Sequence, residues 1–326
     1  MNTMIAALLK GLDQPLEITE LPVPIPDKSQ TIVHLKAAAL NKRDYWITKG
    51  KYPKLVFPLV PGSDGVGLIE GREVIINPGL DWGKNPNQFD PAFRILGMPE
   101  YGTFAESTVV PASNIYDKPS HLSWTEAAAL PVCGVTAYRA MFTRGKATQA
   151  DRMLITGVGG GVATLALLFG VSIGMDVWVT SSSEEKFRLA MQHGASGGIN
   201  YTSPDWEKTL EEKAGRFDLV IDGAGGNDFS RMVQIMNPGG RLVMYGGTSG
   251  NINGLSPQRI FWKQLDILGS TMGSPEDFKN MLDLVNQYKI KPIISHVFPL
   301  RKINDAMDVI TKGEQFGKIC IEIPGD

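Results

Sequence analysis

Cysteine, net charge and long apolar runs are all scarce in this chain. Its only cysteines, Cys133 and Cys320, are too few for a disulfide framework. The formal net charge of −2 creates no basic field that would draw in nucleic acid or an anionic membrane. No apolar run reaches about 18 residues without a charge or a turn signal, and the pair Leu8-Leu9 is too brief for a secretory signal. We therefore expect a cytoplasmic protein that binds neither nucleic acid nor membrane.

The length and the N-terminal pattern indicate two domains. A chain of 326 residues, 43% hydrophobic and 20% charged, is a globular protein too long for one small core. Residues 1–123 alternate short apolar runs with Pro and Gly clusters such as Leu21–Asp27, which predicts a small all-β domain of barrel or sandwich type. Residues 77–101 form a long loop with few element signals, and such loops often line sites. The predicted strands are Met4–Leu9, Thr31–Ala39, Gly65–Ile69, Val74–Ile76 and Phe104–Val110.

The pattern changes at Ser123. Ser123 and Glu126 form a capping box before an Ala-rich helix, which Pro131 should break in two. Beyond Asp151, apolar runs alternate with helical stretches, which predicts an α/β domain with a parallel, doubly wound sheet. The six predicted strands are 153–156, 176–180, 197–201, 217–222, 241–247 and 266–272. Two further helices, Pro275–Tyr288 and Ile303–Lys312, precede KICIEI, which resembles a strand that rejoins an earlier sheet.

A glycine turn lies between the first predicted strand and helix of this α/β region. Gly157, Gly159, Gly160 and Gly161 occur within five residues, directly before the apolar segment Val162–Ile173. Glycines let the backbone approach a pyrophosphate, and a helix start presents N–H groups to it. The spacing is not a strict G-x-G-x-x-G, but its position in the first βα turn of a doubly wound sheet predicts a dinucleotide site.

The end of the second predicted strand bears on which dinucleotide binds. It reads Thr180-Ser181-Ser182-Ser183, and no acid occurs before Glu184. In NAD-binding units an acidic residue at this position binds the ribose hydroxyls. A carboxylate 4 Å from a 2′-phosphate would cost about 1–4 kcal/mol, so its absence permits the phosphate. Ser181, Ser182 and Lys186 can bind it, although Lys186 alternatively forms only a solvated helix face. The sequence predicts NADPH rather than NADH.

Longer motifs extend along essentially the whole chain. They are AAALNKRDYWITKGKYP (37–53), PLVPGSDGVG (58–67), YGTFAESTVVPASNIY (101–116), LPVCGVTAY (130–138), LITGVGGGVATLAL, FDLVIDGAGG, GRLVMYGG, LGSTMGS and GEQFGKI. Together they resemble the medium-chain dehydrogenase/reductase superfamily, and within it the zinc-free quinone oxidoreductase and enone reductase branch. The resemblance implies a GroES-like β-barrel-type catalytic domain (1–123, completed by 273–326). It also implies a Rossmann NADP-binding domain with a doubly wound parallel sheet (124–272).

The resemblance also implies an oligomer and a set of cofactor contacts. It implies a homodimer joined through the last Rossmann strand, near Leu265 to Thr271, where an exposed edge strand would need covering. Tyr201 is alternatively a partly buried strand-end aromatic, and Phe316 a core contact. The implied cofactor-binding residues are Asn41, Thr136, Gly157, Gly159, Gly160, Gly161, Val162, Ser181, Ser182, Lys186, Tyr201, Gly246, Gly247, Gly269, Thr271, Phe316 and Lys318.

The zinc ligands of related dehydrogenases are largely replaced in this chain. Zinc-dependent relatives use Cys, His, Glu and a second Cys, and carry a four-cysteine structural lobe. Here Asn41 stands at the first Cys position and Gly62-Ser63-Asp64 at the Gly-His-Glu motif. Cys133 lies near a ligand position but is alternatively a small buried apolar residue. The four histidines are scattered, and the 77–101 loop has no cysteine. A catalytic zinc needs about three N, S or O ligands, so we expect no bound metal.

The expected reaction follows from this lack of a metal. Without a Lewis acid, oxidation of an unactivated alcohol is hard, whereas hydride addition from NADPH to a quinone or an enone is easier. Donors that hold the developing oxyanion would be Asn41, Tyr52 and Ser63, with Arg43 as a charge partner. Alternatively Asn41 binds the cofactor, Arg43 pairs with a surface acid, and Asp64 orients a neighbour rather than acting as a base. A side chain or solvent would supply the proton.

Two other functions stay open at this point. One is a non-enzymatic role of the zeta-crystallin type, with NADPH and RNA binding. The net charge and the lack of a basic run weigh against it. The other is a zinc alcohol dehydrogenase, against which the ligand count weighs. The sequence does not identify the physiological acceptor.

Overall fold

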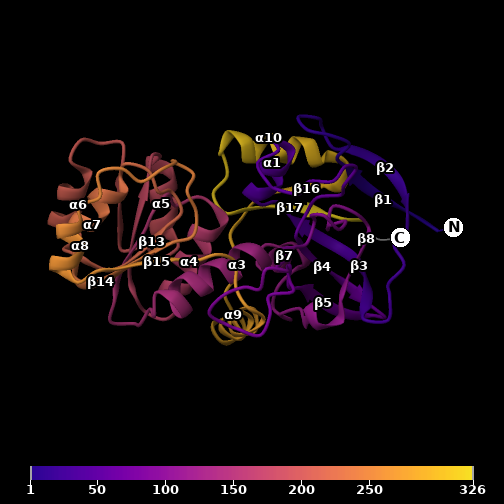
Figure 1. Ribbon diagram of the computed structural model, residues 1–326, viewed down its shortest axis with the longest axis horizontal. Coiled ribbons are helices and arrows are strands. Elements are labelled where there is room, and N and C mark those ends of the chain that lie inside the picture. The colour runs from indigo at the N-terminus through magenta and orange to yellow at the C-terminus, as the bar shows by residue number, and fades with distance from the viewer. Residues whose placement is uncertain (1, 325–326) are drawn as a thin grey trace. The chain divides into compact units, whose positions relative to one another are not determined.

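The computed structural model describes residues 2–324, and the chain divides into two compact units (Figure 1). The first unit comprises the chain up to Cys133 and from Ser274 onward, and the second runs from Gly134 to Gly273. The boundary falls after Cys133 rather than after residue 123 because α2 (Trp124–Ala128) packs on strands of the first unit. Within residues 2–324, no helix is long and apolar enough to cross a bilayer.

The first unit is built on a seven-stranded sheet. Its strand order is β16-β17-β3-β4-β5-β9, and β8 pairs with β3. The part up to residue 123 is mostly β, as expected, although it also contains α1. The C-terminal strand does rejoin an early strand, since Cys320–Glu322 pair antiparallel with Ala37–Ala39. The strands are β3 (Gln30–Ala39), β4 (Asp64–Ile69), β5 (Arg72–Ile76), β8 (Ser107–Pro111), β9 (Ile115–Asp117), β16 (Ile294–Pro299) and β17 (Lys318–Glu322).

Smaller elements surround this sheet. A hairpin of β1 (Thr3–Leu8) and β2 (Glu17–Pro22) was predicted only in its first strand, because the proline cluster after Glu20 indicates a turn. The 77–101 segment is indeed mostly loop, with one short pair of strands, β6 (Gly79–Leu80) and β7 (Arg94–Ile95). The helices are α1 (Lys42–Thr48), α2, α9 (Pro275–Tyr288) and α10 (Ile303–Lys312), and α3 (Pro131–Tyr138) crosses the boundary between the units.

The helix signals at Ser123 and Pro131 were predicted correctly. Ser123 Oγ accepts a hydrogen bond from Glu126 N at 3.2 Å, and the Glu126 carboxylate accepts one from Ser123 N at 2.7 Å. α2 ends at Ala128, and α3 begins at Pro131, whose missing N–H is tolerated in a first helical turn. The capping box and the proline together fix where the chain leaves the first unit.

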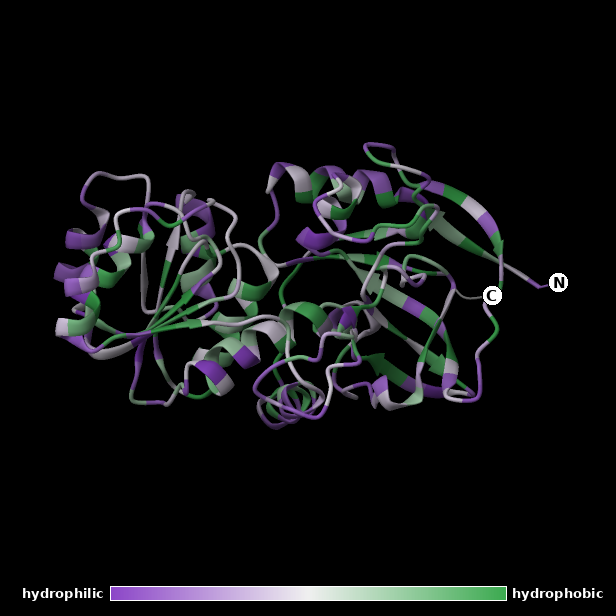
Figure 2. Cartoon of the chain, viewed as in Figure 1, coloured by the Kyte–Doolittle hydropathy of each residue, from purple (hydrophilic) through white to green (hydrophobic). Residues whose placement is uncertain are grey.

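The second unit is the predicted doubly wound α/β domain. Its six strands are all parallel, in the order β12-β11-β10-β13-β14-β15. Figure 2 shows these strands as mostly hydrophobic, as expected for a sheet covered by helices. The strands are β10 (Arg152–Ile155), β11 (Asp176–Ser181), β12 (Gly197–Asn200), β13 (Phe217–Asp222), β14 (Met236–Met244) and β15 (Asp266–Gly269). The helices are α4 (Gly161–Ser172), α5 (Glu184–Gln192), α6 (Trp206–Ala214), α7 (Phe229–Gln234) and α8 (Pro257–Lys263).

Candidate active site

The glycine turn joins β10 to α4 at the topological switch point of the six-stranded sheet. β10 has β11 on one side and β13 on the other, so successive strands are added first on one side of β10 and then on the other. Gly157 and Gly159 have positive φ (62° and 136°), and Gly160 is the N-cap of α4 and has no side chain to accept from the first turn. A Cβ at Gly157 or Gly160 would meet no atom within 4 Å. The turn leaves open space in front of a helix N-terminus, which suits a pyrophosphate.

Lys186 lies against this turn rather than only on a solvated helix face. A Cβ built on Gly159 would lie 2.9 Å from Lys186 Cδ and 3.5 Å from its Nζ. Ser183 caps α5 by accepting from Lys186 N, and Ser181 Oγ accepts from Ser183 N at 3.1 Å. Ser181 is buried, whereas Ser182 is exposed. The structure therefore brings a cation and hydroxyls together beside the glycines, at the end of β11.

Of the other predicted cofactor residues of the second unit, the glycines lie at the same edge of its sheet and the rest lie elsewhere. Gly246 and Gly247 follow β14, and Gly269 ends β15, so they lie at the carboxyl ends of parallel strands, as the glycine turn does. Thr271 is exposed. Thr136 is buried and directs its hydroxyl to Met272 Sδ at 3.9 Å, and Tyr201 is the partly buried strand-end aromatic packed on the core near β12.

In the first unit, Asn41 begins α1, a helix that the sequence reading did not predict. Asn41 N donates to Asp44 Oδ2 at 2.8 Å, and Asp44 N donates to the Asn41 carbonyl at 2.9 Å. An N-cap residue followed three residues later by an acid is a capping signal, but Asp stands where Glu or Gln is usual. This pairing holds the Asn41 backbone fixed. The Asn41 side chain then points away from the helix, into a cluster of buried polar groups.

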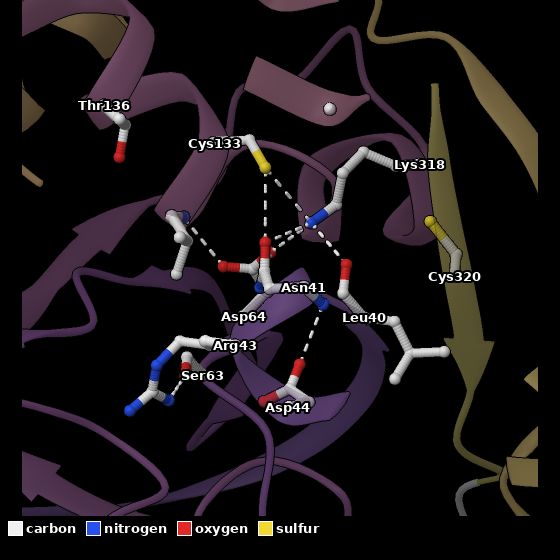
Figure 3. A network of polar contacts seen from close by, with 12 residues as sticks. Leu40, Asn41, Arg43, Asp44, Ser63, Asp64, Cys133, Thr136, Lys318 and Cys320 are labelled. Atoms are coloured by element: carbon white, nitrogen blue, oxygen red, sulfur yellow. Dashed lines mark hydrogen bonds and ion pairs between the residues drawn. The ribbon is translucent and has the colours of Figure 1, made fainter. Parts of the chain in front are cut away.

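Lys318 fills the centre of that cluster (Figure 3). Its Nζ donates to Leu40 O (2.8 Å), Asn41 Oδ1 (2.7 Å) and Asp64 Oδ2 (2.8 Å), and lies 3.6 Å from Cys133 Sγ. Asn41 Nδ2 donates to Asp64 Oδ2 at 2.9 Å, and Cys133 Sγ donates to Asn41 Oδ1 at 3.2 Å. The Lys318 and Asp64 side chains are only 3% and 0% exposed. Asp64 therefore does orient its neighbours, and the only buried ammonium of the cluster is fully engaged.

Burial and charge decide the protonation states of this cluster. Burial raises the pKa of the Cys133 thiol to about 11, although the nearby Lys318 ammonium opposes the shift. Burial alone would lower the pKa of Lys318, but the Asp64 carboxylate outweighs it and the pKa is raised. At neutral pH Lys318 thus stays an ammonium and Cys133 a neutral thiol. Cys133 is small and buried, in agreement with its alternative as a small buried residue, but it also makes hydrogen bonds.

Ser63 and Arg43 form a second group beside the Lys318 cluster. Arg43 Nη1 donates to Ser63 Oγ and, at 3.0 Å, to Leu96 O, and Ser63 Oγ donates to Leu96 O at 2.7 Å. The expectation that Arg43 pairs with a surface acid is wrong, because Arg43 is buried and its hydrogen bonds go to these neutral oxygens. Tyr52 is half-buried, and its ring centre lies 5.4 Å from the Arg43 guanidinium carbon.

The 77–101 loop reaches this group through Leu96. Gly97 has a φ of +91°, and a Cβ there would lie 2.4 Å from Gly62 O. Only glycine permits that close approach of the two backbones. The approach places Leu96 O beside Ser63, where it accepts both hydrogen bonds. The loop whose conformation did not follow from the sequence is therefore part of the site.

Two predicted residues from the C-terminal tail have contacts within the first unit. Phe316 is buried, in agreement with its alternative as a core contact, and its N–H donates to Ser295 Oγ at 3.3 Å. Lys318, implied to lie near the cofactor, has its ammonium in the Asp64 cluster. Local sequence gives no signal for that partnership, because Lys318 and Asp64 are 254 positions apart.

No group of three or more His, Cys, Asp or Glu side chains in residues 2–324 is placed to hold a metal ion. Of the residues compared above with zinc ligands, Asn41 and Asp64 contact the Lys318 ammonium, as does Cys133, and Ser63 binds Arg43. What the arrangement offers instead is a pair of buried cations, one of them neutralised by a carboxylate.

Known proteins match the chain in both units. The family model described as "Alcohol dehydrogenase GroES-like domain" matches residues 27–120, and "Zinc-binding dehydrogenase" matches residues 157–287. Zinc-type alcohol dehydrogenase-like protein YogA of Leptosphaeria maculans is 36% identical over 340 residues, which cover 95% of each chain. Quinone oxidoreductase of Homo sapiens is 25% identical over 305 residues, covering 90% of this chain and 89% of its own. A crystal structure named NAD-dependent alcohol dehydrogenase has a TM-score of 0.93 and 35% identity, and covers 98% of this chain and 100% of that one.

These similarities agree with the structure. They extend over nearly the whole chain, so they include both the seven-stranded unit and the doubly wound unit with its glycine turn. The relatives carry names of both alcohol dehydrogenases and quinone oxidoreductases, so they identify a family rather than one reaction. The chain belongs to the medium-chain dehydrogenase/reductase superfamily of oxidoreductases, with a GroES-like unit and a Rossmann-type unit.

Proposed function

We propose that the protein is an NADPH-dependent oxidoreductase that reduces a quinone or an α,β-unsaturated carbonyl compound without a catalytic zinc. The observation that carries the proposal is the Lys318 ammonium, which lies among Asn41, Asp64 and Cys133. In zinc-dependent relatives the corresponding residues face a dication. Here they face a monocation that belongs to the chain itself.

The donor set does not fit zinc, for chemical reasons. A thiol must lose its proton to ligate zinc, whereas the Cys133 thiol donates a hydrogen bond to Asn41 Oδ1 at 3.2 Å. Asn41 and Ser63 replace a thiolate and an imidazole with much weaker ligands. A dication would also have to displace the Lys318 ammonium, which Asp64 holds at 2.8 Å.

The glycine turn fits a dinucleotide, and its surroundings favour NADPH. Gly157, Gly160 and the first turn of α4 would hold the pyrophosphate, since nothing fills the space in front of them. Lys186 and the hydroxyls at the end of β11 would hold the 2′-phosphate. When bound, NADPH supplies the hydride. NADH is less favoured, because no acid ends β11 to bind the ribose hydroxyls.

The residues of the first unit suit an acceptor that is already polarised. Alcohol oxidation needs a group that lowers the hydroxyl pKa, whereas a quinone or enone needs only donors for the developing oxyanion. The Ser63 hydroxyl donates its hydrogen bond to Leu96 O and accepts one from Arg43, so its proposed role is to position Arg43. Asn41 already donates to Asp64 and remains a proposed positioning group. Tyr52, half-buried beside Arg43, remains a proposed donor.

An acceptor screen tests the reaction. Oxidation of NADPH is followed with quinones, enones and enoyl thioesters, and the reverse reaction with simple alcohols and NADP⁺. We expect turnover with at least one quinone or activated alkene and none with simple alcohols. Elemental analysis after dialysis is the second arm. One equivalent of zinc per chain, together with alcohol oxidation, would contradict the proposal and agree with the name of the Leptosphaeria maculans relative.

A pair of glycine variants tests the cofactor site. Gly159→Ala adds a Cβ at a φ of +136°, 2.9 Å from Lys186 Cδ, and should abolish NADPH binding. Gly239→Ala is the matched control, because Gly239 also has a positive φ (74°) but open space around it. Both variants place a Cβ at a positive φ, so a fluorescence titration is paired with urea unfolding, and a loss of binding by a folded Gly159→Ala alone reports the turn itself. Equal loss of binding in both would argue against the glycine turn as the site.

A further inference from the structure

Arg43 is a buried charged side chain of α1 that has so far been given only the role of a charge partner. Its residue is only 6% exposed, and its guanidinium lies beside Ser63, apart from the Lys318 cluster (Figure 3). Its hydrogen bonds run from Nη1 to Ser63 Oγ and Leu96 O, and the Tyr52 ring lies 5.4 Å from its central carbon. These hydrogen bonds use Nη1 only. Nε and Nη2 make none within the described residues.

The burial of this guanidinium is not compensated by a carboxylate. Over residues 2–324, no acid forms an ion pair with Arg43, and its buried Nε finds no hydrogen-bond acceptor. Arg231, by contrast, is paired with Glu207 at 2.5 Å. A buried donor without a partner costs about 1–3 kcal/mol, and more for a charged group. A buried donor without a partner is explained if a bound molecule supplies the missing acceptor.

The acid next to Arg43 in the chain does not pair with it. Asp44 is buried, its Oδ2 accepts from Asn41 N, and its Oδ1 has no hydrogen-bond partner in the described chain. Asp44 therefore leaves the N–H groups of Arg43 available to a ligand. The Lys318 charge is not available, because Asp64 neutralises it.

We propose that Arg43 is a catalytic residue that binds the carbonyl oxygen of the acceptor through the N–H groups of Nη2, and stabilises the negative charge that develops there. The inference rests on the proposed function and deepens it. A hydride adds to the β-carbon of an enone, and the C=C electron pair shifts to form an enolate whose oxygen faces Arg43. The guanidinium keeps its proton throughout, because an arginine side chain is not deprotonated in proteins. Water then protonates the α-carbon, so one hydride and one proton are added.

An alternative is that Arg43 only ties the 77–101 loop to Ser63 through Leu96 O. That reading predicts a loss of stability on substitution but no preference for anions. It does not account for the unpaired Nε, which makes no contact with the loop oxygen. Ser63 already donates to Leu96 O at 2.7 Å, so the loop keeps one tie without Arg43.

Kinetics with the best acceptor from the screen form the first arm of the test. Arg43→Met should lower kcat about 100-fold to 1000-fold, as loss of an oxyanion donor does, with a smaller change in KM. Arg43→Lys keeps the charge but not the planar fork and should fall between the wild type and Arg43→Met. Lys51→Met is the control, because it removes an exposed cation from the same segment. A kcat for Arg43→Met within threefold of the wild type would overturn the proposal.

Binding of p-nitrophenol, whose phenolate imitates the enolate oxygen, is the second arm and needs no turnover. Its absorbance reports the ionised fraction of the bound probe. We expect the wild type and Lys51→Met to bind the phenolate at least about tenfold more tightly than the phenol, and Arg43→Met to lose that preference. No preference in the wild type, or an unchanged one in Arg43→Met, would overturn the proposal. If Arg43→Met fails to fold, an undiminished preference in Arg43→Lys does so.

The two arms separate this inference from the proposed function. An Arg43-dependent phenolate preference without NADPH oxidation in any screen would leave the anion site standing and remove the proposed reaction. Turnover in the wild type without the phenolate preference would do the reverse.

Discussion

Replacing Lys318 by methionine removes the ammonium at the centre of the buried polar cluster while keeping a side chain of similar length. The substitution leaves the carboxylate of Asp64, which is 0% exposed, without its counter-charge. Two hydrogen bonds to that carboxylate remain, from Asn41 Nδ2 at 2.9 Å and Val132 N at 2.7 Å. The oxygens of Leu40 and Asn41 also lose a donor.

The expected cost follows from this geometry. Breaking a buried ion pair by removing one partner costs about 3–5 kcal/mol, because it strands an uncompensated charge. The two remaining hydrogen bonds to Asp64 place Lys318→Met near the lower end, at about 3 kcal/mol. Asp64→Asn strands the ammonium instead and should cost a similar amount. The double variant removes both charges and should cost only about 1–2 kcal/mol, well below the sum of the single variants.

The assay has to report the first unit specifically. A chain of two units need not unfold in one step, so urea titration is combined with hydrogen–deuterium exchange of peptides from β3 and β17. Lys279→Met is the matched control. Its ion pair with Asp283 has the similar distance of 2.7 Å, but both side chains are more than 60% exposed (64% and 62%), and such pairs contribute about 0–1 kcal/mol. A Lys318→Met cost below about 1 kcal/mol, or a double variant as unstable as the sum, would refute the reasoning.

Three further predictions concern the cofactor, pH and assembly. Lys186→Met should weaken NADPH binding roughly 10-fold to 100-fold and leave NADH within about twofold, and an equal loss for both in fluorescence titrations would count against the 2′-phosphate site. Burial raises the pKa of Asp44 from 3.8 to about 6, so the folded protein loses stability as the pH rises between those values. Asp44→Asn should thus be the more stable protein by about 2–3 kcal/mol above pH 6 and equal to the wild type near pH 4, and a difference independent of pH in urea titrations would exclude this cause. β15 is a sheet edge, and Trp262 on nearby α8 is 83% exposed, so Trp262→Glu should roughly halve the mass of the expected homodimer in light scattering; a monomeric wild type would end that expectation.

Periodicity and breaker residues predicted most of the regular structure. The alternation of apolar runs and helical stretches beyond Asp151 corresponds to six parallel strands, because each run is long enough to cross a sheet that is covered on both faces. The two C-terminal helices, Pro275–Tyr288 and Ile303–Lys312, agree residue for residue with the prediction. β2 and α1 are among the elements that were not predicted. β2 overlaps a proline cluster, and α1 is short, with Asp44 at the position where a capping box usually has Glu or Gln.

The site was predictable only where it depends on local backbone. The glycine turn needs positive φ at Gly157 and Gly159, and glycine is the residue that supplies it. The partner of Arg43 did not follow, because the sequence does not show that the Leu96 carbonyl and the Ser63 hydroxyl converge on its guanidinium. Nor did the 77–101 loop, whose fit against Gly62 depends on two backbones meeting closely.

The sequence by itself determined the two-part architecture and the place of the dinucleotide turn, since both depend on patterns a few residues long. Only the tertiary structure decided the charges around the expected acceptor. Lys318 and Asp64 pair across 254 positions, and the pairing neutralises one buried cation. Arg43 lies in the same unit without a carboxylate and keeps an unpaired Nε. Coulomb energies depend on distance and burial in space, and neighbouring residues in the sequence determine neither. Only the folded structure therefore shows which cation remains available to an acceptor.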